Sequence, residues 1–276
     1  MISSKCLCIV IVTWLTFSPS SKAQAFADAE ERVFAVKVMQ PRAGWSHVCD
    51  AAENAIATLA KNYALEPHRR GHFKTHMFGV AMGNGSKVPH ILVQPDADRK
   101  LHTAFLSQVE NYTNHFSTSA KLWMPELMKD YSDLQCELRR INGALTPVFP
   151  GSPFSACTIN MGPQTVCLPH RDYWNLAHGT CPIGVLGAFN HRTRGHMILH
   201  EPKLIIELWR GDIMFIPSAA VTHENAPIAP NERRYSFTQY TAGGLFCHVW
   251  CDGLNVKELK ASNPAKYKIY ADSGDG

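Results

Sequence analysis

The sequence lacks the features that mark several specialised classes of protein. None of its nine cysteines stands in a C-x-x-C pair, and their number is odd. A chain of 276 residues can bury a core large enough to need no disulfide staples. We therefore expect mostly reduced thiols, which favours a reducing compartment. The sequence also has no internal repeat and no low-complexity tract.

Charge of neither sign dominates the composition. Lysine and arginine number 27 against 23 acidic residues, which gives a formal net charge of +4. A dedicated DNA-binding domain is usually more basic, so this balance permits an anionic substrate or a nucleic acid without requiring one. Hydrophobic residues at 45% and charged residues at 18% are ordinary values for a globular enzyme.

Long apolar runs are also missing, apart from a short one at the N-terminus. The run over residues 6–17 follows Lys5 and precedes small residues, which is the order of regions in a secretory signal peptide. It is too short to span a membrane comfortably, and we expect no membrane partner. Several interpretations of residues 1–24 stay open: a signal peptide, a buried strand at the start of the fold, or a disordered or mis-chosen start.

The first half of the chain is predicted to be mainly helical. Apolar residues recur at helical spacing over 46–62, 98–116 and 117–140, with Ser117 or Ser119 as a candidate cap. Pro125 marks a kink or a restart within the last of these ranges. Residues 142–153, rich in proline and glycine, form the expected boundary loop. We expect a helical region over 25–150, packed on the domain that follows.

From residue 154 onward the pattern changes to short apolar runs separated by turn signals. Seven runs are predicted to be strands: FSACTINM, PIGVLGAF, GHMILH, KLIIELW, DIMFIP, RYSFTQYTA and LFCHVW. Such spacing favours an antiparallel sandwich or jelly roll over a parallel α/β sheet. The predicted fold class is α+β, with a jelly-roll core over 151–253 and a loose polar tail over 254–276.

The segment His170-Arg-Asp172 is the strongest chemical signal. A histidine and an aspartate two residues apart on an extended chain point to the same side, so both can reach one metal ion. His223, about fifty residues later and just after DIMFIP, is the candidate third ligand. Two imidazoles and one carboxylate on one face of an iron leave three positions open, for a bidentate 2-oxo acid and then O₂.

A second signal follows about ten residues after His223. Arg234 is always charged and two-pronged, which suits the distal carboxylate of 2-oxoglutarate. Ser236 shares its strand face and can donate a hydroxyl hydrogen bond to the same carboxylate. Arg233 competes for this role but lacks the RxS spacing.

These residues resemble the signature of the Fe(II)/2-oxoglutarate dioxygenases, which fold as a double-stranded β-helix, a jelly-roll variant. The resemblance covers about residues 154–250. It implies that His170, Asp172 and His223 bind the iron and that Arg234 and Ser236 anchor the co-substrate. The stretch around Asn160 also resembles the strand before HxD in AlkB-type demethylases, which implies that Asn160 contacts 2-oxoglutarate.

A narrower resemblance concerns the runs TVCLPHRDYWNL, GDIMFIPSAAVTHENAPI and RYSFTQYTAGGLF. They are similar to basidiomycete fungal proteins of the TET and J-binding-protein oxygenase group. That resemblance implies oxidation of the methyl group of 5-methylcytosine or thymine, with DNA as the substrate and an intracellular, nuclear location. The alternatives are hydroxylation of a protein side chain or small molecule, in the secretory pathway if residues 1–24 are a signal peptide, and a binding module without turnover.

Other interpretations of the same residues are weaker. The triplet His170-Arg-Asp172 also occurs in protein kinases, but no G-x-G-x-x-G loop or D-F-G motif accompanies it here. Zinc accepts the same three ligands, yet it leaves Arg234 and Ser236 without a role. The oligomeric state is not predicted.

Several residues near these signals have two open interpretations. Tyr173 and Asn175 follow the metal ligands and are candidate substrate contacts. The basic cluster over residues 68–74 either contacts phosphates or forms a solvated loop.

Overall fold

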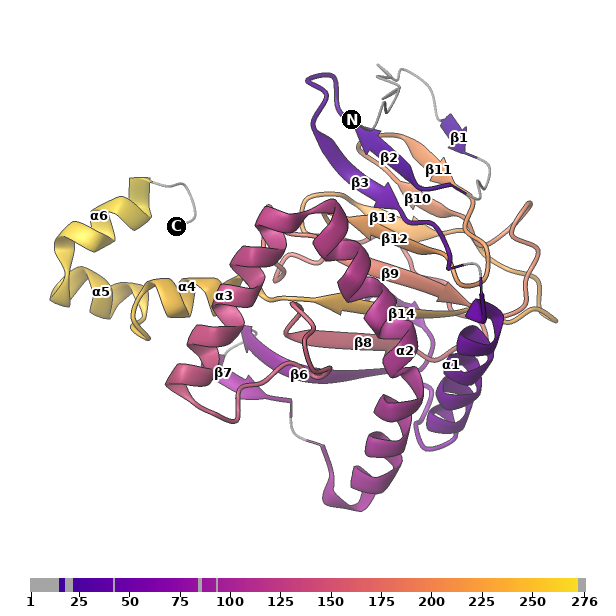
Figure 1. Cartoon of the computed structure of the whole chain (residues 1–276), viewed down its shortest axis with the longest axis horizontal. Coiled ribbons are helices and arrows are strands. Elements are labelled where there is room, and N and C mark those ends of the chain that lie inside the picture. Colours follow the sequence, from indigo (N-terminus) through magenta and orange to yellow (C-terminus); the bar gives the residue numbers. More distant parts are fainter. Residues whose placement is uncertain (1–14, 18–21, 42, 84–85, 93, 273–276) are drawn as a thin grey trace.

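The computed structural model describes residues 15–17, 22–41, 43–83, 86–92 and 94–272. Within these ranges the chain is a mixed α+β protein with an eight-stranded sheet, a four-stranded sheet and a two-stranded hairpin (Figure 1). The strands are β1 (Leu15–Phe17), β2 (Gln24–Ala27), β3 (Val33–Lys37), β4 (Pro67–His68), β5 (Gly71–His72), β6 (Thr75–Gly83), β7 (Ser86–Ile91), β8 (Ala156–Asn160), β9 (Cys181–Leu186), β10 (Met197–Leu199), β11 (Leu204–Ile206), β12 (Ile213–Ile216), β13 (His223–Asn225) and β14 (Tyr235–Tyr240). The helices are α1 (Trp45–Ala60), α2 (Arg99–Trp123), α3 (Pro125–Ile141), α4 (Gly243–Trp250), α5 (Val256–Ser262) and α6 (Pro264–Asp272), with a 3₁₀ turn η1 at Asp96–Asp98.

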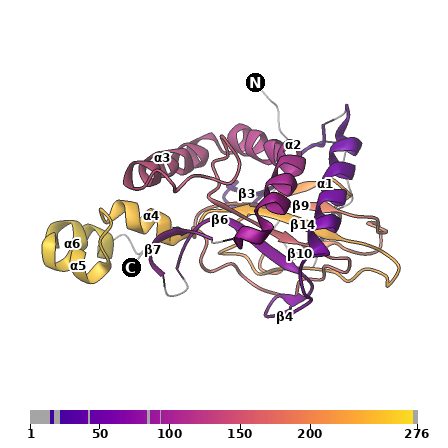
Figure 2. The same cartoon turned by 90° about the horizontal axis from the view of Figure 1, so that it is seen from below.

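The large sheet has helices on one face and the small sheet on the other. Its strand order is β2-β3-β12-β9-β14-β8-β6-β7, and the small sheet has the order β1-β11-β10-β13. Figures 1 and 2 show α1, α2 and α3 on one side of the large sheet, with β10 on the opposite side. The predicted helical packing on one side of a sheet is therefore confirmed.

Alternation along the central strands explains why both faces of the large sheet are covered. In β12, Ile213 and Phe215 pack in the cluster with the helices, whereas Met214 and Ile216 pack in the cluster between the sheets. Successive side chains of a strand point to opposite faces, so a fully apolar strand needs cover on both sides. Gly184 of β9 lets α2 approach closely, because an added Cβ would lie 2.3 Å from the Tyr112 hydroxyl.

The region over 25–150 contributes more than helices. Its strands β2, β3, β6 and β7 belong to the eight-stranded sheet, which the helical prediction missed. The pairing of β6 with β8 places Thr75 opposite Asn160 and crosses the expected division at residue 150. Glycine in the middle and at the end of β6, Gly79 and Gly83, together with its mixed polarity, hid this strand from the periodicity.

The predicted seventh strand, LFCHVW, is wrong: these residues form α4. Both edges of the preceding strand β14 are already paired, with β8 and β9, so the sheet offers no neighbouring place there. The short strand β13 was missed for lack of length.

Two smaller expectations about helix ends also differ. Ser117 and Ser119 lie inside α2 and cap nothing, whereas Pro125 is the restart, in the first turn of α3. The expected loose tail forms α5 and α6, where Asn255 and Glu258 make a reciprocal capping box that sequence polarity alone concealed.

The signal-peptide interpretation falls mostly on residues 1–14 and 18–21, which lie outside the described ranges. Leu15–Phe17 forms β1 and pairs in parallel with β11. Of the helices described, none combines the length and apolar character needed to cross a membrane.

A buried ion pair links β3 to the residue that precedes its neighbour β12. The Lys37 ammonium lies 3.1 Å from an Asp212 carboxylate oxygen, and both side chains are almost fully buried. The Gln40 amide and the Trp209 backbone N–H donate to the same carboxylate, at 2.6 and 2.8 Å. These bonds satisfy the carboxylate in a place that water does not reach.

We expect Asp212→Asn to lower the free energy of unfolding by about 3–5 kcal/mol, because it leaves a buried ammonium without its counter-charge. Urea denaturation measures the loss. The matched control is Asp133→Asn, which breaks an exposed pair with Lys129 and is expected to change the free energy of unfolding little, because water screens both charges. Equal losses in the two variants would show that the Lys37 pair does not hold β3.

Candidate functional site

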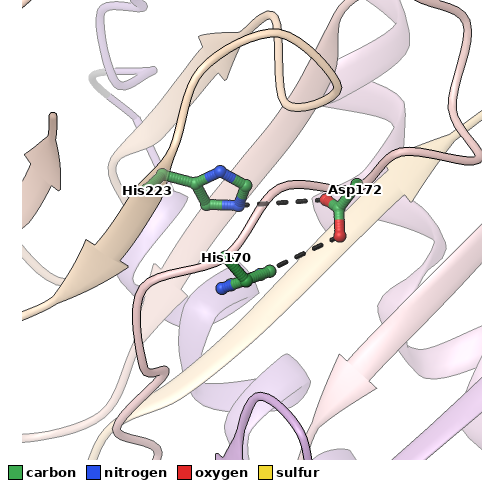
Figure 3. A group of neighbouring side chains, drawn as sticks. All are labelled: His170, Asp172 and His223. Atoms are coloured by element: carbon green, nitrogen blue, oxygen red, sulfur yellow. Dashed lines mark ion pairs between the residues drawn. The ribbon is translucent and has the colours of Figure 1, made fainter. Parts of the chain in front are cut away.

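Three side chains from two segments converge on one point, as Figure 3 shows. His170 and Asp172 lie in the segment between β8 and β9, and His223 begins β13. Their potential ligand atoms all lie within 4.8 Å of one another. The Asp172 carboxylate is 3.9 Å from Nε2 of His170 and 3.8 Å from Nε2 of His223. The structure thus brings together the three predicted metal ligands.

Backbone pairing fixes this convergence. His170 N–H donates to the His223 carbonyl at 3.1 Å, and His223 N–H donates back to the His170 carbonyl at 2.9 Å. Asp172 N–H donates to the Ser218 carbonyl at 2.9 Å. The segment is therefore attached at both ligand positions, to β13 through His170 and to the loop after β12 through Asp172.

The two imidazoles are prepared as metal ligands. Nδ1 of His170 donates to the Leu168 carbonyl at 2.7 Å, and Nδ1 of His223 donates to the Val221 carbonyl at 3.0 Å. A carbonyl can only accept, so each Nδ1 carries the proton and each Nε2 presents a lone pair to the shared point. Burial first, and then the adjacent His223 ring, lower the pKa of His170 to about 4, which keeps it neutral near pH 7.

Arg234 is buried beside this centre, and no acidic side chain of the described residues pairs with it. Only 2% of the residue is exposed, and its Nε has no hydrogen-bond partner among the described residues. Burial lowers the pKa of Arg234 to about 10, so it stays charged at neutral pH. A buried cation with an unsatisfied donor is costly unless an anion joins it. Arg233, by contrast, is exposed, as strand alternation predicts.

Arg234 and the three candidate ligands line one cavity of about 450 Å³, a figure that includes the solvent at its mouth. Asn160 and Ser236 line it as well. Ile183 and Met197 supply apolar wall, which limits the water that can enter. The sequence-predicted anchor residues and the predicted metal ligands therefore share one space.

Hydrogen-bonded polar side chains from three neighbouring strands fix the orientation of Ser236, one of the two predicted co-substrate anchors. Asn160 donates from Nδ2 to the Ser236 hydroxyl at 2.8 Å, and the Thr75 hydroxyl donates to Asn160 Oδ1 at 3.3 Å. Ser236 therefore uses its oxygen as the acceptor and keeps its own O–H to donate. Thr75 was missed by the sequence interpretation, because nothing near it in the chain signals its partners.

Asn225 was also missed. Its carboxamide accepts from Cys167 N–H at 2.9 Å and donates to the Thr165 carbonyl at 3.1 Å. It thereby ties the segment before His170 to the strand of His223. The two-residue spacing from His223, which places both side chains on one strand face, was the signal that could have found it.

The two candidate substrate contacts differ in position. Asn175 lines an open groove next to the metal cavity, together with Asp172 and Trp174, and donates to the Ser218 hydroxyl at 3.0 Å. Tyr173 is 68% exposed and lies on a neighbouring apolar pocket instead. Four histidines near the motif, His178, His191, His196 and His200, are absent from the lining of the metal cavity.

No protein-family model matches the chain, and no curated protein matches it either. Among solved structures, NgTET1 in complex with 5mC DNA is similar, with a TM-score of 0.63 and 15% identity over 87% of this chain and 84% of that one. A 2OG-Fe(II) oxygenase family oxidoreductase from Burkholderia pseudomallei gives a TM-score of 0.36 and 15% identity, covering 73% of this chain and 92% of that one. The viral collagen prolyl hydroxylase of Paramecium Bursaria Chlorella virus-1, in its 2OG complex, gives 0.40 and 13%, covering 76% and 96%. At these identities the likeness to NgTET1 is a likeness of fold.

Proposed function

We propose that the chain is an Fe(II)- and 2-oxoglutarate-dependent dioxygenase that hydroxylates a C–H bond, on a double-stranded β-helix core. The observation that carries the proposal is the shared cavity: a two-histidine, one-carboxylate face lies next to a buried arginine that has no counter-charge among the described residues. A metal ion with open coordination positions would bind the three ligands, and a dianionic co-substrate would supply the negative charge that the arginine lacks.

The donor set fits iron. Both Nε2 atoms are free to bind because both Nδ1 atoms donate to carbonyls, and Asp172 supplies one negative charge. Zinc would also accept these ligands. A zinc site alone, however, gives no reason for a charged guanidinium to be buried in the same cavity with an unsatisfied Nε. The orphaned Arg234 therefore favours iron with 2-oxoglutarate over zinc.

The chain's own residues have separable tasks in this mechanism. His170, Asp172 and His223 would hold the metal, and Arg234 with the Ser236 hydroxyl would bind the distal carboxylate of the co-substrate. When bound, Fe(II) with 2-oxoglutarate and O₂ supplies the oxidising power for hydroxylation, with succinate and CO₂ as co-products. Asn160 orients Ser236 for its hydrogen bond. The apolar wall of the cavity limits competing water.

We propose that the substrate C–H bond belongs to the methyl group of a modified nucleobase, 5-methylcytosine or thymine. The fold likeness to a protein solved with 5mC DNA supports this class, together with an open groove that reaches Asp172 and has a volume of about 1370 Å³, open solvent included. A base in duplex DNA would have to be flipped out of the stack to reach the metal. Hydroxylation of a protein side chain or small molecule is the alternative.

The substrate proposal is tested by incubating the iron-reconstituted protein with methylated DNA, 2-oxoglutarate and O₂, and measuring the nucleosides by mass spectrometry. We expect oxidised methyl groups that depend on all three additions. Succinate formation without any oxidised nucleoside would leave the dioxygenase assignment standing and exclude the nucleobase.

The metal ligands give the first prediction about activity. Asp172→Ala and His170→Ala should each abolish succinate formation, because a facial set reduced to two ligands does not hold the metal productively. Anaerobic titration with Fe(II) measures the binding, and circular dichroism checks the fold. His178→Ala is the control, since His178 is exposed and outside the metal cavity. Normal turnover in Asp172→Ala would refute the assignment.

The co-substrate anchor gives the second prediction. Arg234→Ala should raise the apparent KM for 2-oxoglutarate about thirty-fold or more, because losing one partner of a buried charged pair costs about 2–5 kcal/mol and each 1.4 kcal/mol is about tenfold. Arg234→Lys should recover only part of the loss, since a point charge replaces a two-pronged donor. Arg233→Ala, at the exposed neighbour, is the matched control. The reverse pattern would assign the anchor to Arg233.

A further inference from the structure

The structure places the basic cluster over residues 68–74 next to the segment that carries the metal ligands. Arg69 and Arg70 form the turn between β4 and β5. The Leu168 N–H donates to the Arg70 carbonyl at 2.7 Å, which ties this turn to the segment that leads into His170. Gly71 allows the close approach, because an added Cβ would lie 2.5 Å from the Val166 carbonyl oxygen. Arg70 is thus held against the metal segment.

Arg70 borders two spaces at once. It lines the metal cavity with His170 and Asp172, and it lines the open groove with Trp174 and Asn175. It therefore lies where a molecule in the groove would enter the cavity. This position differs from that of Arg234, which lines the cavity but not the groove.

The Arg70 guanidinium has no acidic partner within ion-pair distance in the part of the chain that the structure describes. Arg171, beside the metal ligands in the chain, shows the contrast: that guanidinium pairs with Glu201 and donates to the Thr222 hydroxyl at 2.9 Å. Asp172 is the one acid among the described residues of the groove wall, against Arg69 and Arg70. With Asp172 committed to a metal ion, the wall of the groove is positive and attracts an anion.

Part of the groove lining is aromatic. The Trp174 side chain is 63% exposed and lines the groove, and Tyr240 and Met77 add to its surface. A flat ring can stack on an exposed indole while an attached anion pairs with a guanidinium. Of the anionic compounds that combine a ring and a charge, a nucleotide fits this pair of features.

We propose that Arg70 binds a phosphate next to the base that is oxidised, with Arg69 as a second, outer contact. This inference rests on the proposed function and names the group that holds the substrate's backbone at the cavity mouth. A guanidinium suits this task because its donors bind two phosphate oxygens together.

The test uses two short single-stranded oligonucleotides that contain one 5-methylcytosine. One has ordinary phosphates, and the other has neutral methylphosphonates on both sides of the methylated base. Binding is measured by fluorescence anisotropy under argon, with Fe(II)- and 2-oxoglutarate-loaded protein. We expect Arg70→Gln to weaken binding of the ordinary strand about tenfold, and to reduce the magnitude of the salt slope by about 0.7, the value for one single-strand phosphate. It should leave binding of the neutral strand unchanged.

Two variants make the result specific. Arg140→Gln removes the same charge from an exposed site on α3 that lines neither the cavity nor the groove, and it should bind both strands like the unmodified chain. Arg70→Lys should recover part of the lost affinity, since it keeps the charge without the fork.

Three outcomes would overturn the proposal. One is an equal loss for both strands, and another is no loss beyond that of Arg140→Gln. The third is absence of binding to either strand by the unmodified chain, which would exclude a nucleic-acid strand as the occupant of the groove. Titrations of Fe(II) and 2-oxoglutarate on the same preparations separate the two proposals. If the unmodified chain binds neither, the dioxygenase proposal fails; if Arg70→Gln weakens only 2-oxoglutarate, Arg70 serves the co-substrate instead.

Discussion

The pair of backbone hydrogen bonds between His170 and His223 is the constraint on which the site depends. These bonds join a segment without regular secondary structure to the first residue of β13. Because each histidine is bound through its own backbone, the two rings lie with their centroids 4.3 Å apart and their Nε2 atoms beside one carboxylate. Asn225, two residues further along, reinforces the same junction through Cys167. Removing this junction would separate ligands that are distant in sequence.

The large sheet supplies the second half of the site by its register. Ser236 lies opposite Asn160, and Asn160 lies opposite Thr75, so one row of three strands presents a connected set of polar groups. A one-residue slip in any of these strands would turn its polar group to the other face, where the helices pack. The buried aromatic residues on that face, including Phe237 and Phe116, hold the register from the opposite side. One strand register therefore sets both the packing of the core on one face of the sheet and the geometry of the site on the other.

Burial of Arg234 shows how the fold accepts a cost at its functional site. Taking a guanidinium out of water costs several kcal/mol, and no acidic side chain repays it here among the residues described. The Lys37–Asp212 pair is equally buried, but there the attraction between the two charges and further hydrogen bonds to the carboxylate offset the loss of hydration. The difference between these two buried cations distinguishes a structural ion pair from a site prepared for an anionic ligand.

The sequence by itself determined the features that depend on local spacing. His170 and Asp172 stand two apart, Arg234 and Ser236 stand two apart, and extended chain turns each pair to one side. The helical periodicity over α1 to α3 and the strand runs from β8 to β12 were readable for the same reason, since each is a repeat within a few residues. This local information was enough to predict the metal ligands and the anchor as candidates.

Tertiary structure alone decided what depends on partners far along the chain. The strands of the first half joined the sheet because β8 and β12 had open edges for β6 and β3, which no local period records. The run LFCHVW became α4 because the edges of β14 were already paired. Thr75 and Arg70 came to the site through register and through a turn bound to the metal segment. Spacing along the chain fixes which way a side chain points, but only packing fixes what it meets.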